Sequence, residues 1–246
     1  MAAPARKRAL HAAAGARIDA EAVAAKAVEL GVMGWVRPTG EIHAEGAPNA
    51  VDALMGFLGV APIERARVEG HEQFAIRGVS AGVFVIQEHQ ATAHHYGLRL
   101  EVNGVMRSWA VPKGPSLDPA AKRLAVEVED HSLADNDFEG MLGERSDGER
   151  AARDSGGVIV WDRGMYEQGG RVAWPEALER GHAVFVLHGA KVRGGFALQR
   201  TRPGVKPQWL LIKRRDDDAR PGSDIVAERP ESVISGRTLA QVRGPK

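Results

Sequence analysis

The sequence predicts two dissimilar domains, an α+β domain over residues 1–79 and a mainly-β, barrel-like domain over residues 80–246. The first part is rich in alanine and carries apolar residues at helical spacing. From Phe84 onward, short runs of alternating apolar and polar residues are separated by turn signals. The chain has 246 residues, of which 43% are hydrophobic, so it is long and apolar enough for two buried cores.

The first domain is expected to follow the order strand, helix, strand, strand, helix, strand. Asp19 is a suitable N-cap for the first helix, and Gly31 suits the position just beyond its end. Pro48 favours the first turn of the second helix. Strands are predicted at residues 8–14, 34–36, 41–45 and 66–79. This order predicts a ferredoxin-like α+β sandwich.

The second domain is expected to be an antiparallel sheet or barrel. Asn103-Gly104 lies between two alternating runs and suits a type I′ hairpin turn. One short helix is predicted at 175–180, and the charged tail after Asp216 is predicted to be irregular. Further strands are predicted at 124–128, 158–161, 183–187, 195–199 and 209–213.

The composition limits the classes of function. With 33 basic and 32 acidic residues, nucleic-acid binding would have to come from a local patch. The absence of cysteine excludes disulfides and thiolate zinc sites. No apolar run approaches the roughly 20 residues of a membrane helix, and the basic start lacks the apolar stretch of a signal peptide. We therefore expect a cytoplasmic protein with no membrane contact.

Histidine and arginine side chains are predicted to share one face of the second domain. Residues two apart in a strand point the same way, so His95, Gly97 and Arg99 lie together, with His89 on the preceding strand or bend. Imidazole binds transition metals, and arginine binds phosphate. The pattern indicates a phosphate or metal–phosphate site, although scattered histidines on a solvated sheet face would give the same spacing.

Three motifs carry a family resemblance, and they occur in the family's order. They are FVIQEHQATAHHYGLRLEV, SWAVPKGPS and VEDH, within the range Phe84 to Leu239. This range resembles the 3′-phosphoesterase domain of bacterial DNA ligase D. The later segments VIVWDRGMY, WLLIKRRDDDA and PESVISGRTL are similar to the same family.

The resemblance implies a manganese-dependent enzyme that trims a 3′-terminal ribonucleotide and removes the remaining 3′-phosphate. It implies that His89 and His95 are metal ligands. It also implies that four residues contact the scissile phosphate: Arg99, Lys113, Arg123 and His131. Taken singly, each of the last three has a simpler interpretation as a residue beside a turn or at the surface.

Departures from the family pattern leave the catalytic function open. Gly97 stands where the family has a metal-ligand aspartate, and Asp135 stands where it has a tyrosine. The family stretch after Gly140 gives way to a polar segment, Gly143 to Gly157, which we expect to be a mobile loop. The family's N-terminal arm is not recognisable.

Two main functions are therefore carried forward. One is a DNA-repair enzyme acting on 3′ ends with Mn²⁺, and the other is a non-catalytic module that binds a 3′ end or a phosphate. A third alternative is a purely structural partner. The sequence contains no nucleotidyl-lysine motif of a ligase, so a separate DNA ligase or end-binding protein is the expected partner.

The first domain also carries a resemblance. Leu30 to Gly46, followed by a helix and His71 to Arg77, resembles acylphosphatase. The position of that family's catalytic arginine falls on Ala20, and the position of its asparagine falls on Pro38. Acylphosphatase activity is therefore not expected, and the domain is predicted to dock, to dimerise or to replace the missing N-terminal arm.

Overall fold

The computed structural model describes residues 7–14, 18–61, 64–90, 93–142 and 156–243. The chain divides into two compact units, which are described separately. The first comprises Met1–Val79 and Glu167–Ala177, and the second comprises Ser80–Tyr166 and Leu178–Lys246. The segment Glu167–Ala177, which the sequence placed in the second domain, therefore groups with the first unit. The predicted loop at Gly143 to Gly157 falls almost entirely outside the described residues.

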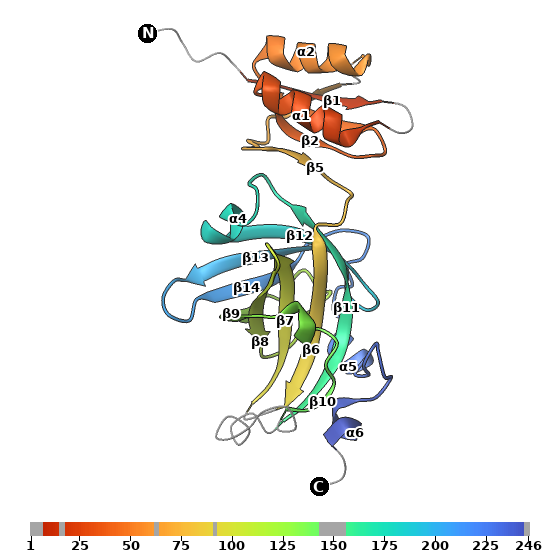
Figure 1. Ribbon diagram of the computed structural model, residues 1–246, viewed down its shortest axis with the longest axis vertical. Helices are drawn as coiled ribbons and strands as arrows, with labels where there is room; N and C mark the ends of the chain where they lie inside the picture. The colour runs from red at the N-terminus through yellow and green to blue at the C-terminus, as the bar shows by residue number, and fades with distance from the viewer. Residues whose placement is uncertain (1–6, 15–17, 62–63, 91–92, 143–155, 244–246) are drawn as a thin grey trace. The chain divides into compact units, whose positions relative to one another are not determined.

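The first unit is a five-stranded sheet with two helices, and it confirms the predicted α+β order (Figure 1). Its elements are β1 (Arg8–Ala13), α1 (Ala20–Leu30), β2 (Met33–Val36), β3 (Glu41–Gly46), α2 (Pro48–Leu58), β4 (Glu64–Ala66) and β5 (Phe74–Ile76). The strand order is β4-β1-β3-β2-β5, in which β2 and β5 are parallel and the other pairs are antiparallel. Alternate residues of β1 and β3, such as Leu10 and Ile42, pack with both helices in one core.

The predicted helix ends of the first unit are confirmed. The Asp19 carboxylate accepts hydrogen bonds from the N–H groups of Glu21 and Ala22 at the start of α1. Gly31 ends this helix in the left-handed conformation, with φ of 67°. Pro48 occupies the first turn of α2. Short-range signals therefore mark both ends of α1 and the start of α2.

The single strand predicted over 66–79 is wrong, because the structure has two short strands, β4 and β5, joined by a loop. Gly70 in this loop has φ of 79°. The N–H groups of Glu69, Gly70 and His71 donate to the carboxylate of Glu45 instead of to a neighbouring strand. A side chain on β3 therefore interrupts the strand pattern that the local sequence suggests.

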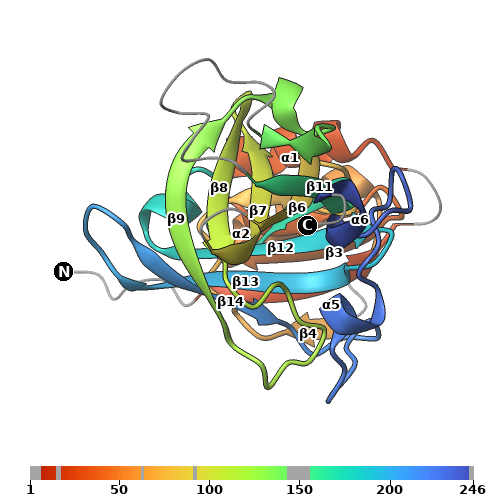
Figure 2. The ribbon, with the colours of Figure 1, turned by 90° about the horizontal axis from the view of Figure 1, so that it is seen from below.

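The second unit is a closed antiparallel barrel, as the sequence predicted. Its strands are β6 (Gly82–Gln90), β7 (His94–Val102), β8 (Val105–Val111), β9 (Arg123–His131), β10 (Gly140–Met141), β11 (Gly157–Gly169), β12 (His182–Gly189), β13 (Arg193–Arg202) and β14 (Gln208–Lys213). In the described part of the chain, eight strands form a ring because β11 pairs with both β12 and β6, while β10 extends the sheet beside β11 (Figure 2). The β7–β8 hairpin turns at Asn103 and Gly104, both with positive φ, which confirms the type I′ turn.

Large aromatic side chains fill the barrel interior. Trp109, Trp161 and Trp209 are at most 1% exposed, and Trp109 packs edge-on against Trp209 with ring centroids 6.1 Å apart. Tyr96 meets Trp161 edge-on at 5.6 Å. Because successive strand residues alternate between faces, this packing assigns Tyr96 and Leu98 of β7 to the interior and His95, Gly97 and Arg99 to the outer face.

The tail after Asp216 is mostly irregular, as predicted, but it also contains helices that were not predicted. It forms two short helices, α5 (Ile225–Glu228) and α6 (Leu239–Arg243), with Ile225 and Leu239 buried. The indole of Trp161 and the ammonium of Lys191 both donate to the carbonyl of Arg229. Since these partners lie far away in the sequence, the local pattern could not reveal the docking. The predicted helix at 175–180 is confirmed as α4 (Glu176–Glu179).

Among the described residues, the helices are all too short or too polar to traverse a lipid bilayer.

Candidate phosphate site on the barrel

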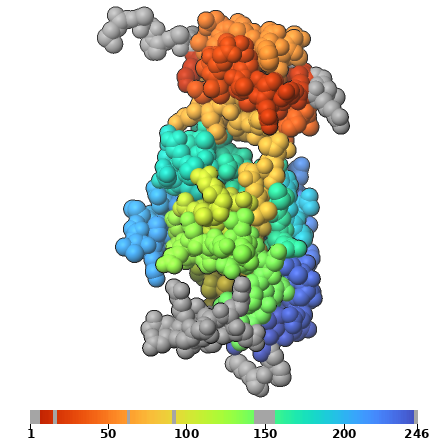
Figure 3. Space-filling view, viewed as in Figure 1, coloured from red at the N-terminus to blue at the C-terminus, as the bar shows by residue number. Residues whose placement is uncertain are grey.

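A pocket of about 620 Å³ lies on the outer face of β6, β7, β8 and β9. The 3-10 helix η1 (Leu133–Asp135) lies in front of β6 and β7 and forms one wall (Figure 1). Figure 3 shows this part of the chain, in green, at the surface of the second unit. The polar part of the lining comes from seven residues: Gln87, His89, His95, Arg99, Ser108, His131 and Asp135.

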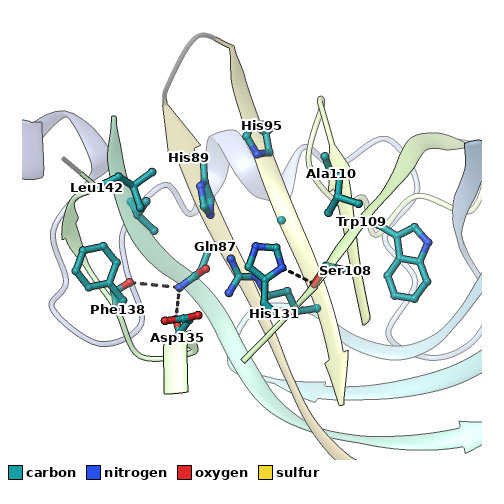
Figure 4. A pocket seen from close by; sticks show the side chains of 14 residues that line it. Gln87, His89, His95, Ser108, Trp109, Ala110, His131, Asp135, Phe138 and Leu142 are labelled. Carbon is teal, nitrogen blue, oxygen red and sulfur yellow. Dashed lines mark hydrogen bonds between the residues drawn. The ribbon is translucent and has the colours of Figure 1, made fainter. Parts of the chain in front are cut away.

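The sheet register brings these side chains together. His89 lies directly across from His95, and Gln87 from Gly97. Arg99 lies across from Ser108 on the next strand. Cross-strand partners share a face, so the outer faces of three strands meet at one place. The predicted shared face of His89, His95 and Arg99 is therefore present in the pocket. Figure 4 shows His89 and His95 side by side on their neighbouring strands.

The two predicted metal-ligand histidines form a stacked pair, with ring centroids 5.1 Å apart and planes at 24°. Burial, with smaller contributions from nearby cationic groups, lowers the pKa of His89 to about 3, so its ring is neutral. Its Nε2 is buried and has no hydrogen-bond partner among the described residues. Nδ1 of His95 lies 3.2 Å from the carbonyl of Ala93, which can only accept, so Nδ1 is a donor and the lone pair of a neutral ring would be on Nε2.

His131 lies beside this pair and has a defined tautomer. The Ser108 hydroxyl donates to the carbonyl of Met106 at 2.7 Å, so toward His131 it acts as an acceptor. Nδ1 of His131, 3.1 Å away, is therefore the donor, and Nε2 keeps its lone pair in the neutral ring. Burial and the nearby Arg99 lower the pKa of His131. A phosphate near this ring would instead favour the protonated form, which can donate.

Arg99 is the cation of the pocket and is only 5% exposed. Its Nη1 is buried and has no hydrogen-bond partner among the described residues. Burial lowers its pKa to about 10, while Asp135 acts in the opposite direction, so the guanidinium stays charged at neutral pH. A buried cation with an unused donor favours an anion with several acceptor oxygens.

Gln87 is a pocket residue that the sequence analysis missed. Its Nε2 donates to the carbonyl of Asp135 at 3.0 Å and to that of Phe138 at 3.3 Å, which holds η1 against the sheet (Figure 4). The sequence did contain a signal for Gln87, because it is two residues before His89 and the two side chains of one strand therefore share a face. Asp135, which stands where the family has a tyrosine, lies in the pocket wall beside Arg99 and His131.

The structure does not bring Lys113 and Arg123 into this pocket, since neither lines it. Lys113 is exposed in the turn after β8. Arg123 begins β9, whereas His131 ends it, and eight residues of strand span about 26 Å. Strand alternation puts Arg123 on the same face as the buried Ala125. Val128, which lines the pocket, points to the other face of the strand. The assignment of Lys113 and Arg123 to the scissile phosphate came from the family resemblance. Because of the register shift opposite Met106 and Ser108, alternation from His131 does not extend to Arg123.

The residues present do not complete a manganese site. Two imidazole nitrogens are available, but among the described residues the pocket holds no group of three ligand atoms from histidine and carboxylate side chains close to one another. Manganese prefers oxygen ligands. At Gly97, where the family has its aspartate, an added Cβ would lie 3.8 Å from Nε2 of His89, so a side chain would fit.

The fold and the site together define a class of protein. It is a closed antiparallel barrel whose outer face carries a pocket lined by histidine and arginine. Residues 87–200, which lie within the barrel, match the DNA Ligase D 3′-phosphoesterase domain. The assignment made from the sequence motifs is thereby confirmed, and the chain is related to proteins of DNA repair by non-homologous end joining.

Three curated relatives carry LigD names. The "Multifunctional non-homologous end joining protein LigD" of Pseudomonas aeruginosa is 46% identical over 170 residues, which cover 65% of this chain and 19% of that protein. The protein of the same name from Mycolicibacterium smegmatis is 40% identical over 144 residues, covering 56% and 18%. The "Multifunctional non-homologous end joining DNA repair protein LigD" of Mycobacterium tuberculosis is 41% identical over 133 residues, covering 54% and 16%. The chain therefore spans less than a fifth of the length of these relatives.

One solved structure is similar to part of this chain. It is described as the structure of an acylphosphatase from Coxiella burnetii. The match covers 29% of this chain and 93% of that one, at 24% identity and a TM-score of 0.26.

Proposed function

We propose that the barrel recognises the 3′ ends of nucleic acids in DNA-end repair by holding a terminal phosphate against Arg99. The observation that carries this proposal is the buried, unpartnered Nη1 of Arg99 inside a pocket that also holds three histidines. A phosphate oxygen would supply the missing acceptor, and charge-assisted hydrogen bonds of this kind are strong. His131 would then donate to a second oxygen in its protonated form.

Binding to 3′-phosphate and 3′-hydroxyl ends tests this proposal. Fluorescence anisotropy would compare two duplexes that differ only in the terminal group. We expect tighter binding of the phosphate end, and we expect Arg99→Gln to reduce that preference about tenfold or more, because a hydrogen bond to a charged group contributes about 1.5–3 kcal/mol. Arg202→Gln is the matched control, since Arg202 is exposed on β13 outside the pocket. Equal binding of both ends by the unaltered protein would refute the proposal.

A second candidate function is hydrolysis at the same end, with removal of a 3′-terminal ribonucleotide or 3′-phosphate. The stacked pair His89 and His95 favours it, because Nε2 of His89 is buried in the pocket with no hydrogen-bond partner among the described residues and Nδ1 of His95 faces the carbonyl of Ala93, which leaves its Nε2 for a metal. In this proposal the pair binds a divalent metal such as Mn²⁺ together with oxygens of the substrate. Its partner would be a DNA ligase acting on the same ends, in line with the end-joining relatives.

A resection assay separates the two functions. The protein would be incubated with manganese and a duplex whose primer ends in one ribonucleotide, and the primer length would be followed on a denaturing gel. Hydrolysis predicts shortening that is lost in His95→Ala. It also predicts that shortening persists in His94→Ala, because His94 lies on the opposite face and bonds to Glu88 at 2.7 Å. Binding without shortening would leave recognition as the function.

A further inference from the structure

A second cluster of ligand-type side chains lies in the first unit, remote in sequence from the barrel pocket. His43, Glu69 and His71 each offer one ligand atom, and these three atoms lie within 4.8 Å of one another. Neither of the resemblances found in the sequence assigns a role to these residues.

His43 is buried with its polar atoms unsatisfied. It is in the middle of β3, between His11 of β1 and Trp35 of β2, with ring centroids 4.9 Å and 6.1 Å away. Since Ile42 packs with the helices, His43 points to the opposite face of the sheet. Its exposure is 0%, and neither ring nitrogen has a hydrogen-bond partner among the described residues. Buried polar atoms in native proteins usually have a partner.

Glu45 holds the other two side chains in place next to His43. Its carboxylate accepts the N–H groups of Glu69 at 2.8 Å and Gly70 at 3.3 Å, and also that of His71. This fixes the backbone of the loop between β4 and β5. Glu69 and His71 are two residues apart, and Nε2 of His71 lies 3.0 Å from Oε2 of Glu69. Nδ1 of His71 has no hydrogen-bond partner among the described residues.

The charges of the cluster suit a divalent cation. The rings of His43 and His71 are buried, at 0% and 2% exposure, and a neutral imidazole nitrogen can ligate a metal. Burial alone would raise the pKa of Glu45, but the three backbone N–H groups outweigh it, so the pKa ends below its usual value. The Glu45 carboxylate is only 1% exposed and lies 3.6 Å from Nε2 of His43. Two carboxylates, those of Glu45 and Glu69, would balance one divalent ion.

We propose that His43, Glu69 and His71 bind one divalent transition-metal ion, with zinc as the best fit, and that Glu45 orients this site as an outer-shell carboxylate. Two imidazoles and one carboxylate form a common zinc ligand set. Ligand atoms in a tetrahedral zinc site are about 3.3 Å apart, so the cluster needs only small side-chain rotations. The Glu69 side chain is 47% exposed and offers a route from solvent. The ion would tie the loop between β4 and β5 to β3.

Zinc titration of the full chain tests this proposal. The His95→Ala background removes the barrel pair from the measurement, and calorimetry with Zn²⁺ and absorption with Co²⁺ report binding. We expect one zinc per chain, with affinity reduced at least about tenfold in Glu69→Gln and in His71→Asn. Glu69→Gln changes a half-exposed side chain, so it tests the site even if His71→Asn does not fold.

The matched control is Glu64→Gln. Glu64 is also an exposed glutamate of the first unit bonded to a histidine, with 3.2 Å between its Oε1 and Nδ1 of His11, but it lies outside the cluster. Its replacement should leave zinc affinity unchanged. The proposal is overturned if the His95→Ala protein takes up no zinc, or if Glu69→Gln and Glu64→Gln bind zinc equally. Neither result bears on recognition of 3′ ends by the barrel.

Discussion

Replacing Gly97 with aspartate tests whether the barrel pocket is a metal site that lacks one ligand. An added Cβ at Gly97 would lie 3.8 Å from Nε2 of His89 and 3.9 Å from the carbonyl oxygen of Gln87, both ordinary contact distances. A carboxylate there would share the face of His95 and point into the pocket. We therefore expect the variant to fold and to hold a third ligand next to the two imidazoles.

The expected gain can be expressed as stability. Manganese at 100 times its dissociation constant stabilises the protein that binds it by about 2.7 kcal/mol. For a unit of this size, such a gain raises the melting temperature by about 5–10 °C. The new carboxylate also favours protonation of His89. At about 4 Å and with an effective dielectric constant of about 20, the charge–charge interaction is about 4 kcal/mol, which would raise the pKa of His89 by about 3. The pKa of His89, now about 3, would move toward its ordinary value, so the test belongs near pH 8.

The assay is thermal unfolding with and without Mn²⁺, with Gly97→Asn as the matched control. Asparagine has the same size as aspartate but no charge, and any effect of manganese on the first unit is common to both variants. We expect a manganese-dependent rise in melting temperature in Gly97→Asp that exceeds the rise in Gly97→Asn. Equal shifts in the two variants would refute the idea that the pocket is a metal site lacking one carboxylate.

Two further predictions concern other residues of the pocket. Because the folded pKa of His89 lies below that of the unfolded chain, stability is fully present above about pH 6.5 and falls as the pH drops toward 3, by about 1.4 kcal/mol per pH unit. Denaturant unfolding at pH 7.5 and 5.0 should show this loss, and His89→Gln should reduce it; an unchanged pH dependence in that variant would contradict the assignment. Gln87→Ala removes two hydrogen bonds to the η1 segment and should cost about 1–3 kcal/mol of unfolding free energy. Gln199→Ala, which removes three hydrogen bonds of an exposed amide on β13, should cost less, and the reverse order would show that Gln87 does not hold η1.

The sequence by itself determined the features that depend on neighbouring residues. Asp19 and Gly31 end a helix, and Asn103-Gly104 turns a hairpin, because capping and turn chemistry involve atoms a few positions apart. Strand alternation was sufficient to put His95 and Arg99 on one face. The family motifs added the position of His131, which no local rule would bring near Arg99.

Only the tertiary structure decided which distant side chains meet. The tail after Asp216 is ordered by hydrogen bonds at Arg229 to groups far away in the sequence. Gln87 became a pocket residue because η1 folds back over β6, and Arg123 fell outside the pocket because of its place on β9. His43 and His71 are separated by 27 residues of strand, helix and loop. They meet because the Glu45 carboxylate accepts hydrogen bonds from the backbone of the loop between β4 and β5. Such contacts depend on sheet register and long-range closure, whose free energies come from the whole fold and leave little trace in a short stretch of sequence.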